Sequence, residues 1–242
     1  MESKTDPGRL RRSELIGGIL YWPVFLLGMP LLAAFAVDFF WPSKDEALEL
    51  TRVNFLFGLL NAAALILIFR RYLKDQFSRL QWRGWRLFAD VGLGYVIYFG
   101  LAYAAGIVIQ LLTGLFSVEN VNANQEAVEA SVRAVPALAI IDACLLAPPA
   151  EELLTRGLIF CGLYRRSRFW AYALSMLVFS FAHCAGSILY QPVGVTVINL
   201  VTYLPAGFIL AHVYERTETI WTSILLHGVI NAVSLALQAV MG

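Results

Sequence analysis

Hydrophobic residues run through this sequence in seven stretches separated by short polar segments. The stretches cover roughly 15–41, 53–69, 87–116, 134–164, 169–188, 193–214 and 220–241. Most are long enough to cross the hydrocarbon core of a bilayer, which takes about 20 helical residues. Helices are the expected spanning form, because lipid offers an exposed backbone no hydrogen-bond partners. The pattern predicts an all-α fold, a polytopic bundle of about seven transmembrane helices.

Composition agrees with this prediction. Hydrophobic residues make up 59% of the 242 residues and charged residues only 14%, and the mean hydropathy is +0.69. Soluble domains carry nearer a quarter charged residues. The first stretch continues to about Trp41, which is longer than the 7–15 apolar residues of a signal peptide. We therefore expect it to be retained as the first span.

The distribution of Lys and Arg predicts the orientation. Lys and Arg were summed over alternate loops. Fourteen lie on one side, in the N-terminal tail, the loops 70–86 and 165–168, and at Arg216. Three lie on the other side, namely Lys44, Arg52 and Arg133. The positive-inside rule then predicts a cytoplasmic N-terminus and an external C-terminus. Loop 70–86 mixes Arg with aromatic residues, and its position favours a cytoplasmic loop or interfacial helix on anionic lipid over a nucleic-acid site.

Two further features set limits on the fold. The three cysteines, Cys144, Cys161 and Cys184, lie within or at the edge of the apolar stretches. An odd, intramembrane set argues against a disulfide framework, so we expect free thiols that pack as small apolar groups. The acidic, amide-rich segment 117–131 is typical of an external connector.

Polar residues interrupt three of the apolar stretches at overlapping depths. They are Glu151, Glu152 and Arg156 in the fourth stretch, His183 in the fifth, and His227 and Asn231 in the seventh. A charged side chain at the centre of a bilayer costs roughly 2.5–3.5 kcal/mol on insertion scales. At about 1.5 Å per helical residue, all six lie roughly 10–21 Å from the cytoplasmic ends of their helices. This coincidence indicates a functional site.

Helical spacing predicts which of these side chains meet. Glu152 and Arg156 are four residues apart and can form an ion pair, which leaves Glu151, about 100° round the helix, for a different partner. His227 and Asn231 project together for the same reason. Phe179 and His183 share the spacing, so the aromatic ring can pack beneath the imidazole.

Two prolines precede the carboxylates, and a few polar residues stand alone in other apolar stretches. Pro148 and Pro149 predict a kink or break in the fourth helix next to the site, and exposed backbone at membrane depth requires protein or a watery cavity. His212 is expected to be an interfacial residue. Structural or water-facing roles are expected for the single acids, which are Asp38, Asp90 and Asp142.

The ordered motifs carry a family resemblance. The segment Glu151–Arg156 reads EExxxR, Phe179–His183 reads FxxxH and His227–Asn231 reads HxxxN. In this order, they resemble the CPBP (CAAX protease and bacteriocin-processing, or Abi) family of intramembrane proteases. The resemblance covers roughly 133–240, and Thr155 stands where the family often has Phe. We therefore expect a cytoplasmic tail (1–14), variable N-terminal transmembrane helices (15–132) and a catalytic helical core (133–242).

The resemblance implies a division of roles that fits the chemistry of peptide hydrolysis. A base must activate water and hydrogen-bond donors must stabilise an oxyanion. Glu151 and His183 are expected to act on the water, and His227 and Asn231 on the oxyanion. Glu152 with Arg156 would support them, as would Phe179.

A metal-dependent version uses the same residues differently. His183, His227 and Glu152 could supply the three protein ligands of a catalytic zinc, with water in the fourth position. Arg156 beside the site disfavours a dication, so the sequence favours a metal-free mechanism, but no cofactor and a single divalent metal such as zinc both stay open. A serine mechanism has no support, since no GxSx pattern is present.

Two other function classes remain alternatives to the endopeptidase. Intramembrane Glu and His also build proton-coupled transporters, although these more often show internal repeats, and none is visible here. A catalytically silent membrane scaffold is the other alternative. For the peptidase, the expected partners are a peptide or protein substrate entering from the membrane and membrane lipid, with no nucleic acid. The compact loops favour an integral protein of a prokaryotic plasma membrane.

Overall fold

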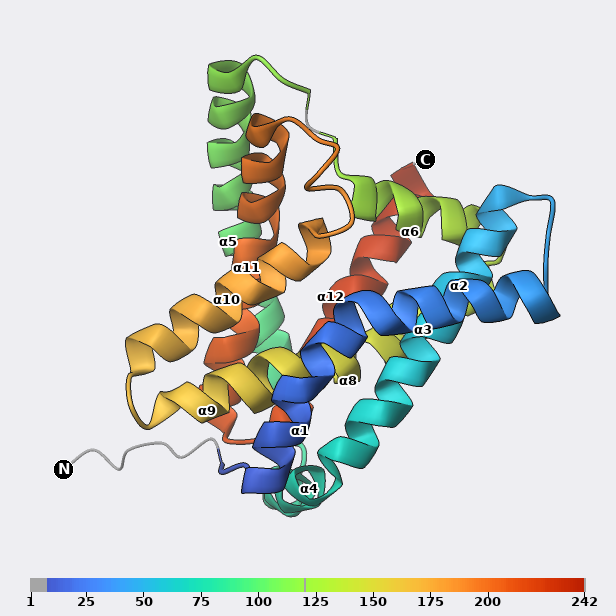
Figure 1. Cartoon of the computed structure of the whole chain (residues 1–242). Helices are drawn as coiled ribbons and strands as arrows, with labels where there is room; N and C mark the ends of the chain where they lie inside the picture. Colours follow the sequence, from blue (N-terminus) through green and yellow to red (C-terminus); the bar gives the residue numbers. More distant parts are fainter. Residues whose placement is uncertain (1–7, 120, 242) are drawn as a thin grey trace.

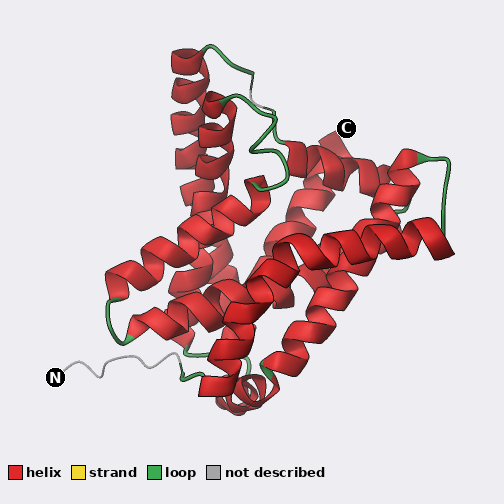
Figure 2. Cartoon of the chain, viewed as in Figure 1, coloured by secondary structure: helices red, strands yellow, loops and turns green. Residues whose placement is uncertain are grey.

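The structure, a computed structural model, describes residues 8–119 and 121–241, and within them the chain is helical with no strand (Figures 1 and 2). The helices and π-helical segments (η) are α1 (Arg12–Pro23), η1 (Val24–Gly28), α2 (Met29–Phe40), α3 (Glu46–Ile68), α4 (Arg70–Arg83), α5 (Arg86–Phe116), α6 (Ala123–Ala134), α7 (Pro136–Ile141), η2 (Asp142–Leu146), α8 (Ala147–Glu152), η3 (Leu153–Phe160), α9 (Cys161–Tyr164), α10 (Arg168–Cys184), α11 (Val193–Thr217) and α12 (Ile220–Met241). The predicted all-α fold is confirmed. The first half of the expected 1–14 tail, residues 1–7, lies outside the described residues.

Five helices are long and apolar enough to cross a membrane. They are Arg12–Phe40, Glu46–Ile68, Arg86–Phe116, Val193–Thr217 and Ile220–Val240, and they correspond to the first, second, third, sixth and seventh predicted stretches. The fourth stretch is helical too, but it carries the charged residues of the candidate site. The fifth forms α10, which has 17 residues. Within residues 8–119 and 121–241, all seven stretches are thus helical, but only five helices have the length and composition of a span, and the predicted count of about seven spans is not confirmed.

The ends of two predicted segments differ in the structure. α10 ends at Cys184, before the expected end at 188, and the chain turns over 185–190, where Gly186 and Ser187 are weak helix formers. The predicted connector 117–131 contains the helix α6. Asn122 begins α6 by accepting a hydrogen bond from the Gln125 backbone N–H at 3.1 Å, which satisfies a free donor of the first turn.

The fourth stretch is irregular where Pro148 and Pro149 predict a kink. The prolines occupy the first turn of α8, where the absence of a backbone donor does no harm. π-helical turns precede and follow α8, so the chain changes its helical winding on both sides of Glu151 and Glu152. Such π-helical turns frequently occur at functional sites.

The basic segment 70–86 forms a helix followed by a tight turn. α4 covers Arg70–Arg83, and Gly84, with φ of +52°, makes the turn into α5, a conformation that glycine adopts without steric cost. Tyr72 of α4 is buried and its hydroxyl lies 2.6 Å from that of Tyr214 on α11. α4 is thus attached to the helical core.

In Figure 1, α5 and α11 run side by side, α10 crosses α11, and α1–α3 lie on the other side of the molecule. α8, α9 and α12 lie between these two groups. One core cluster joins α3, α4, η3 and α11 around Phe160, Tyr72 and Tyr214. A second joins α10, α11 and α12 around Phe179, Leu210 and Leu226. The candidate site lies where α8, α10 and α12 meet.

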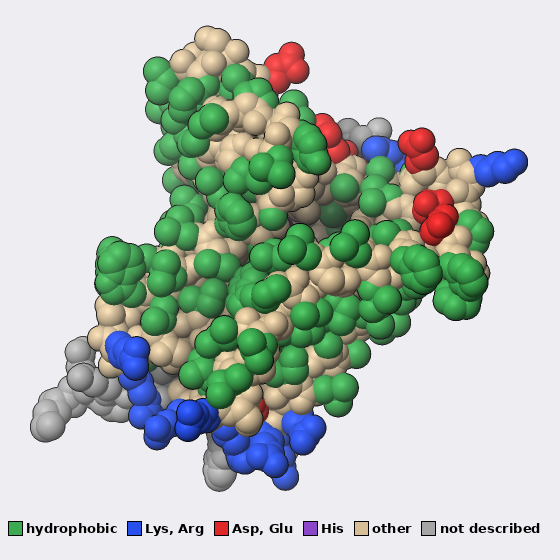
Figure 3. Space-filling view, in the orientation of Figure 1, with side chains coloured by type: hydrophobic (Ala, Val, Ile, Leu, Met, Phe, Trp, Pro, Cys, Tyr) green, Lys and Arg blue, Asp and Glu red, His purple; other side chains and the backbone are tan. Residues whose placement is uncertain are grey.

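The outer surface is that of a membrane protein. Many large apolar side chains are exposed on the long helices, for example Phe88, Val96, Tyr103 and Leu115 along α5, and a soluble protein rarely exposes so much contiguous apolar area. Figure 3 shows apolar side chains over most of the face, with Lys and Arg gathered at the end that carries α4. This grouping agrees with the predicted cytoplasmic end.

Candidate active site

Glu152 lies at the centre of a fully buried network. Its Oε1 accepts from Arg156 Nη1 at 2.9 Å, and neither side chain is exposed. Its Oε2 accepts from the Ser223 hydroxyl of α12. Arg156 also donates to Thr155 Oγ1 and to the Gly207 carbonyl, both at 2.8 Å. The predicted ion pair is present, and it joins η3 to α11 and α12.

Arg156 also contacts an aromatic ring. Its guanidinium carbon lies 4.7 Å from the ring centroid of Phe179, a cation–π geometry. The same Phe179 ring lies 4.5 Å from the His183 ring and 5.5 Å from the His227 ring, between centroids. Phe179 thus packs against His183 as the spacing predicts, and it touches both histidines.

His227 is held by the same carboxylate. Its Nδ1 lies 3.0 Å from Glu152 Oε1. Because the carboxylate faces a guanidinium and can only accept, Nδ1 carries the proton in this contact. The other ring nitrogen, Nε2, then has a free lone pair in the neutral imidazole and lies 3.8 Å from Glu151 Oε2.

His183 is fixed in a similar way by its own helix. Its Nδ1 lies 2.9 Å from the Phe179 carbonyl oxygen, which is also only an acceptor, so Nδ1 donates there. Nε2 lies 3.5 Å from Glu151 Oε2. Nε2 of both imidazoles therefore approaches Glu151 Oε2. The sequence predicted only that Glu151 has a partner other than Arg156.

Glu151 Oε2 is buried and has no hydrogen-bond partner among the described residues. Three acceptors thus converge, namely this oxygen and two imidazole nitrogens. A buried acceptor without a donor costs about 1–3 kcal/mol. A water molecule has two O–H groups and therefore donates to two of these three acceptors at a time.

Asn231 lies one turn beyond His227 on α12, and its contact is with backbone. Its Nδ2 donates to the Ala143 carbonyl of η2 at 2.7 Å. The carbonyl of Cys144 faces the same helix, because a Cβ on Gly228 would lie 2.8 Å from it. Asn231 therefore ties α12 to the π-helical turn that precedes the carboxylates. A second amide hydrogen of Asn231 remains for another acceptor.

The predicted metal ligands do not fit a metal well. Among the described residues, no group of three or more His, Cys, Asp and Glu side chains has an arrangement that could hold an ion. Glu152, the predicted carboxylate ligand, bonds Arg156, Ser223 and His227. A dication bound there would displace or face the Arg156 guanidinium. His183 and His227 instead face Glu151.

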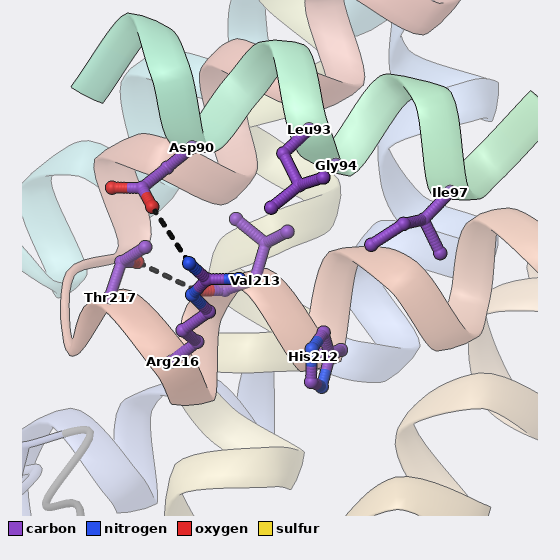
Figure 4. A pocket seen from close by; sticks show the side chains of 8 residues that line it. All are labelled: Asp90, Leu93, Gly94, Ile97, His212, Val213, Arg216 and Thr217. Carbon is purple, nitrogen blue, oxygen red and sulfur yellow. Dashed lines mark hydrogen bonds and ion pairs between the residues drawn. The ribbon is translucent and has the colours of Figure 1, made fainter. Parts of the chain in front are cut away.

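Of two small cavities, one adjoins the candidate site and the other lies away from it. One is lined by Glu151, Thr155 and Phe179 together with Trp22 and Phe25 of the first long helix. The other lies between α5 and α11, and it is lined by Asp90, His212 and Arg216 among others (Figure 4).

The second cavity contains residues that the sequence predicts to be non-catalytic. Asp90 forms an ion pair with Arg83 at 2.5 Å and lies 3.9 Å from Arg216. His212 is stacked on Phe208 with ring centroids 6.0 Å apart. These contacts indicate a structural role for both residues. Asp142 lies in η2, and a Cβ on Gly58 of α3 would collide with it.

Three residues of the site are missing from the sequence prediction. Ser223 lies four residues before His227, so helical spacing alone could have placed it on the same face of α12. Thr155, at a position where the related family often has Phe, bonds both Arg156 and the Glu151 carbonyl. Tyr203 stacks on His183 with centroids 4.4 Å apart, and no motif or spacing in the sequence indicates this contact.

The site consists of a buried carboxylate that faces two imidazoles within a helical membrane protein. Such a site is suited to moving protons, as hydrolysis requires. Comparison with known proteins identifies the class as membrane peptidases. Residues 133–233 match the family described as type II CAAX prenyl endopeptidase Rce1-like, and this range contains every residue of the candidate site.

A relative with a similar description matches over most of the chain. The candidate membrane peptidase YdiL of Bacillus subtilis (strain 168) is 24% identical over 215 residues, which are 88% of this chain and 82% of that protein. No solved structure matches the chain. The segment 133–233 is thus similar to the Rce1-like family, in agreement with the CPBP resemblance, and the protein is an integral membrane peptidase.

Proposed function

We propose that this protein is an intramembrane endopeptidase of the CAAX-protease type, which hydrolyses a peptide bond with water activated by Glu151 and His183. The observation that carries the proposal is the convergence of Nε2 of His183 and His227 on Glu151 Oε2, at 3.5 and 3.8 Å. Water held by these acceptors lies beside a base. No protein nucleophile is needed.

Glu151 takes the water proton as the oxygen attacks the peptide carbonyl. The proton then goes to the leaving amine, either from Glu151 or through His183 Nε2, which receives a proton while Nδ1 stays bonded to Phe179. The atoms balance, because water supplies the new carboxyl oxygen and the proton of the new amine. Both side chains are partly exposed, 22% for Glu151 and 15% for His183, while the reacting oxygen Glu151 Oε2 is itself buried.

His227 and Asn231 are proposed to stabilise the oxyanion. Because Nδ1 of His227 donates to Glu152, Nε2 donates to the oxyanion only after it takes up a proton of its own. In that state it no longer accepts from the water, which Glu151 and His183 then hold. Arg156 compensates the charge of the buried Glu152 carboxylate. The free amide hydrogen of Asn231 would be the second donor.

The proposed mechanism needs no metal. Support comes from the bonds that occupy Glu152 and from the nearby Arg156 guanidinium. A peptide that carries a C-terminal prenylated CAAX motif is the first substrate to test, because the family description names a CAAX prenyl endopeptidase.

The test compares cleavage of such peptides in detergent by the wild type, Glu151→Gln and His183→Ala. Each substitution is expected to lower the cleavage rate by roughly 100-fold or more, in line with the loss of a positioned general base. Glu129→Gln, which alters an exposed carboxylate on α6, is the matched control and should cleave like the wild type. Full turnover by both site variants would refute the assignment.

A further inference from the structure

Tyr203 of α11 lies against the candidate site although no motif includes it. Its ring is stacked on His183 with centroids 4.4 Å apart and an interplanar angle of 29°. His183 is the penultimate residue of α10, and the chain after it turns away. The ring therefore depends for its orientation on the Phe179 carbonyl, the Phe179 ring and Tyr203.

The hydroxyl of Tyr203 is held by a segment far away in the sequence. It donates to Asn122 Oδ1 at 3.1 Å and accepts from Asn124 Nδ2 at 3.0 Å. Asn122 is also the residue that caps α6. The phenol is thus fixed at one end by the start of α6 and contacts the imidazole with its ring.

A second contact strengthens the same attachment. Asn199, one turn before Tyr203 on α11, donates to the Val121 carbonyl at 3.0 Å and to Gln191 Oε1 at 3.1 Å. The segment 121–124 is therefore bound to α11 at two successive turns. The residue at one of these turns, Tyr203, stacks directly on His183.

We infer that Tyr203 is a positioning residue of the peptidase, and that segment 121–124 holds it so that its ring fixes the plane of His183. With Nδ1 bonded to the Phe179 carbonyl, rotation of the imidazole out of this plane would move Nε2 away from Glu151 Oε2. Small displacements of a catalytic group have large effects on rate, about 100-fold for roughly 1 Å. The inference rests on the proposed function, since it assigns Tyr203 a part in that reaction.

The experiment compares Tyr203→Leu, Tyr203→Phe and Asn124→Ala in the peptide cleavage assay. Tyr203→Leu removes the stacked ring and should lower kcat roughly tenfold or more while KM stays within about twofold. Tyr203→Phe keeps the ring and should restore most of the rate. Asn124→Ala, which removes one bond to the hydroxyl, should resemble Tyr203→Phe.

Tyr172 provides the matched control. It is a half-buried tyrosine on α10 whose hydroxyl bonds Glu215 and whose ring packs on Phe160. Tyr172→Leu should lower thermal stability without the selective loss of kcat. The thermal midpoint of each variant, measured in the same detergent, separates misfolding from misplacement of His183.

The outcomes distinguish this inference from the proposed function. If Glu151→Gln abolishes cleavage and Tyr203→Leu keeps the wild-type kcat, the positioning role is wrong and the peptidase assignment stands. A Tyr203→Leu variant that loses kcat and stability to the same extent as Tyr172→Leu, with no rescue by Phe, would also overturn the role. Wild-type turnover by both Glu151→Gln and His183→Ala would overturn the peptidase assignment and, with it, the positioning role.

Discussion

At the scale of single residues, the two adjacent glutamates have opposite environments. Glu152 has no exposed surface and is neutralised by Arg156 at 2.9 Å, whereas Glu151 faces two imidazoles and retains an unpartnered oxygen. Neighbouring carboxylates thus lie in separate environments, and we propose a structural role for Glu152 and a chemical role for Glu151. The 100° step between consecutive helical residues makes this division possible.

The Glu152–Arg156 pair should make a large contribution to stability. Glu152→Met leaves the buried Arg156 cation without its carboxylate and should lower the free energy of unfolding by about 3–5 kcal/mol. The double variant Glu152→Met/Arg156→Met should recover part of the loss, because no charge is left buried. Chemical unfolding in detergent measures both. Additive losses in the double variant would contradict the pairing.

Metal independence is also a prediction at the residue scale. Since Glu152 is occupied by Arg156 and Ser223, we expect cleavage to be unchanged after incubation with EDTA or 1,10-phenanthroline. Elemental analysis of the active protein should find metal well below one equivalent. Loss of cleavage on chelation that zinc restores would show that a bound metal is required.

At the scale of elements, the site depends on the close approach of α12 to η2. Gly228 lies against the Cys144 carbonyl, and the adjacent turn carries the bond from Asn231 to the Ala143 carbonyl. His227 precedes Gly228 directly. The distance between α12 and η2 therefore determines where His227 stands.

Gly228→Ala should disturb this contact. The added Cβ would lie 2.8 Å from a backbone oxygen, so α12 must move, at a cost of about 1–3 kcal/mol. We expect a cleavage rate at least tenfold lower, because the shift carries His227 with it. Gly100→Ala on α5, where no atom lies within 4 Å of the added Cβ, is the control and should leave the rate unchanged. Equal rates in the two variants would show that this contact does not position the site.

The sequence predicted those elements and contacts that depend on helical periodicity. Apolar stretches and i,i+4 spacing were enough to place Glu152 on Arg156 and Phe179 beneath His183. The π-helical turns around α8 were not predictable beyond an irregularity at Pro148, because winding depends on packing rather than on local preference. Tyr203 was missed for a related reason. Its contact with His183 is fixed by the packing of α10 on α11 and by Asn122 and Asn124, which lie about 80 residues away.

At the scale of the whole molecule, charge and apolar surface together define an orientation. Lys and Arg gather at the α4 end (Figure 3), and five helices are suited to cross a membrane. Arg79 and Arg83 of α4 donate to backbone carbonyls at the end of α11, so the basic helix is bound to the core at that end. The predicted cytoplasmic side is therefore also the side where α4 and α11 meet.

The orientation can be tested with reporter fusions. We expect a reporter active only outside the cytoplasm to be active when fused after α12 and inactive when fused within 70–83. A reporter active only in the cytoplasm, fused at the same points, is the control and should give the opposite result. Activity of the external reporter within 70–83 would reverse the orientation.

The central claim is that water held by Glu151 and His183 attacks the peptide bond directly. A single turnover with excess enzyme in H₂¹⁸O, followed by mass spectrometry of the cleaved peptide, tests it. We predict one ¹⁸O atom in the new carboxyl group from the first turnover. A first-turnover product that contains only ¹⁶O would show that an enzyme carboxylate attacks instead, and would contradict the mechanism.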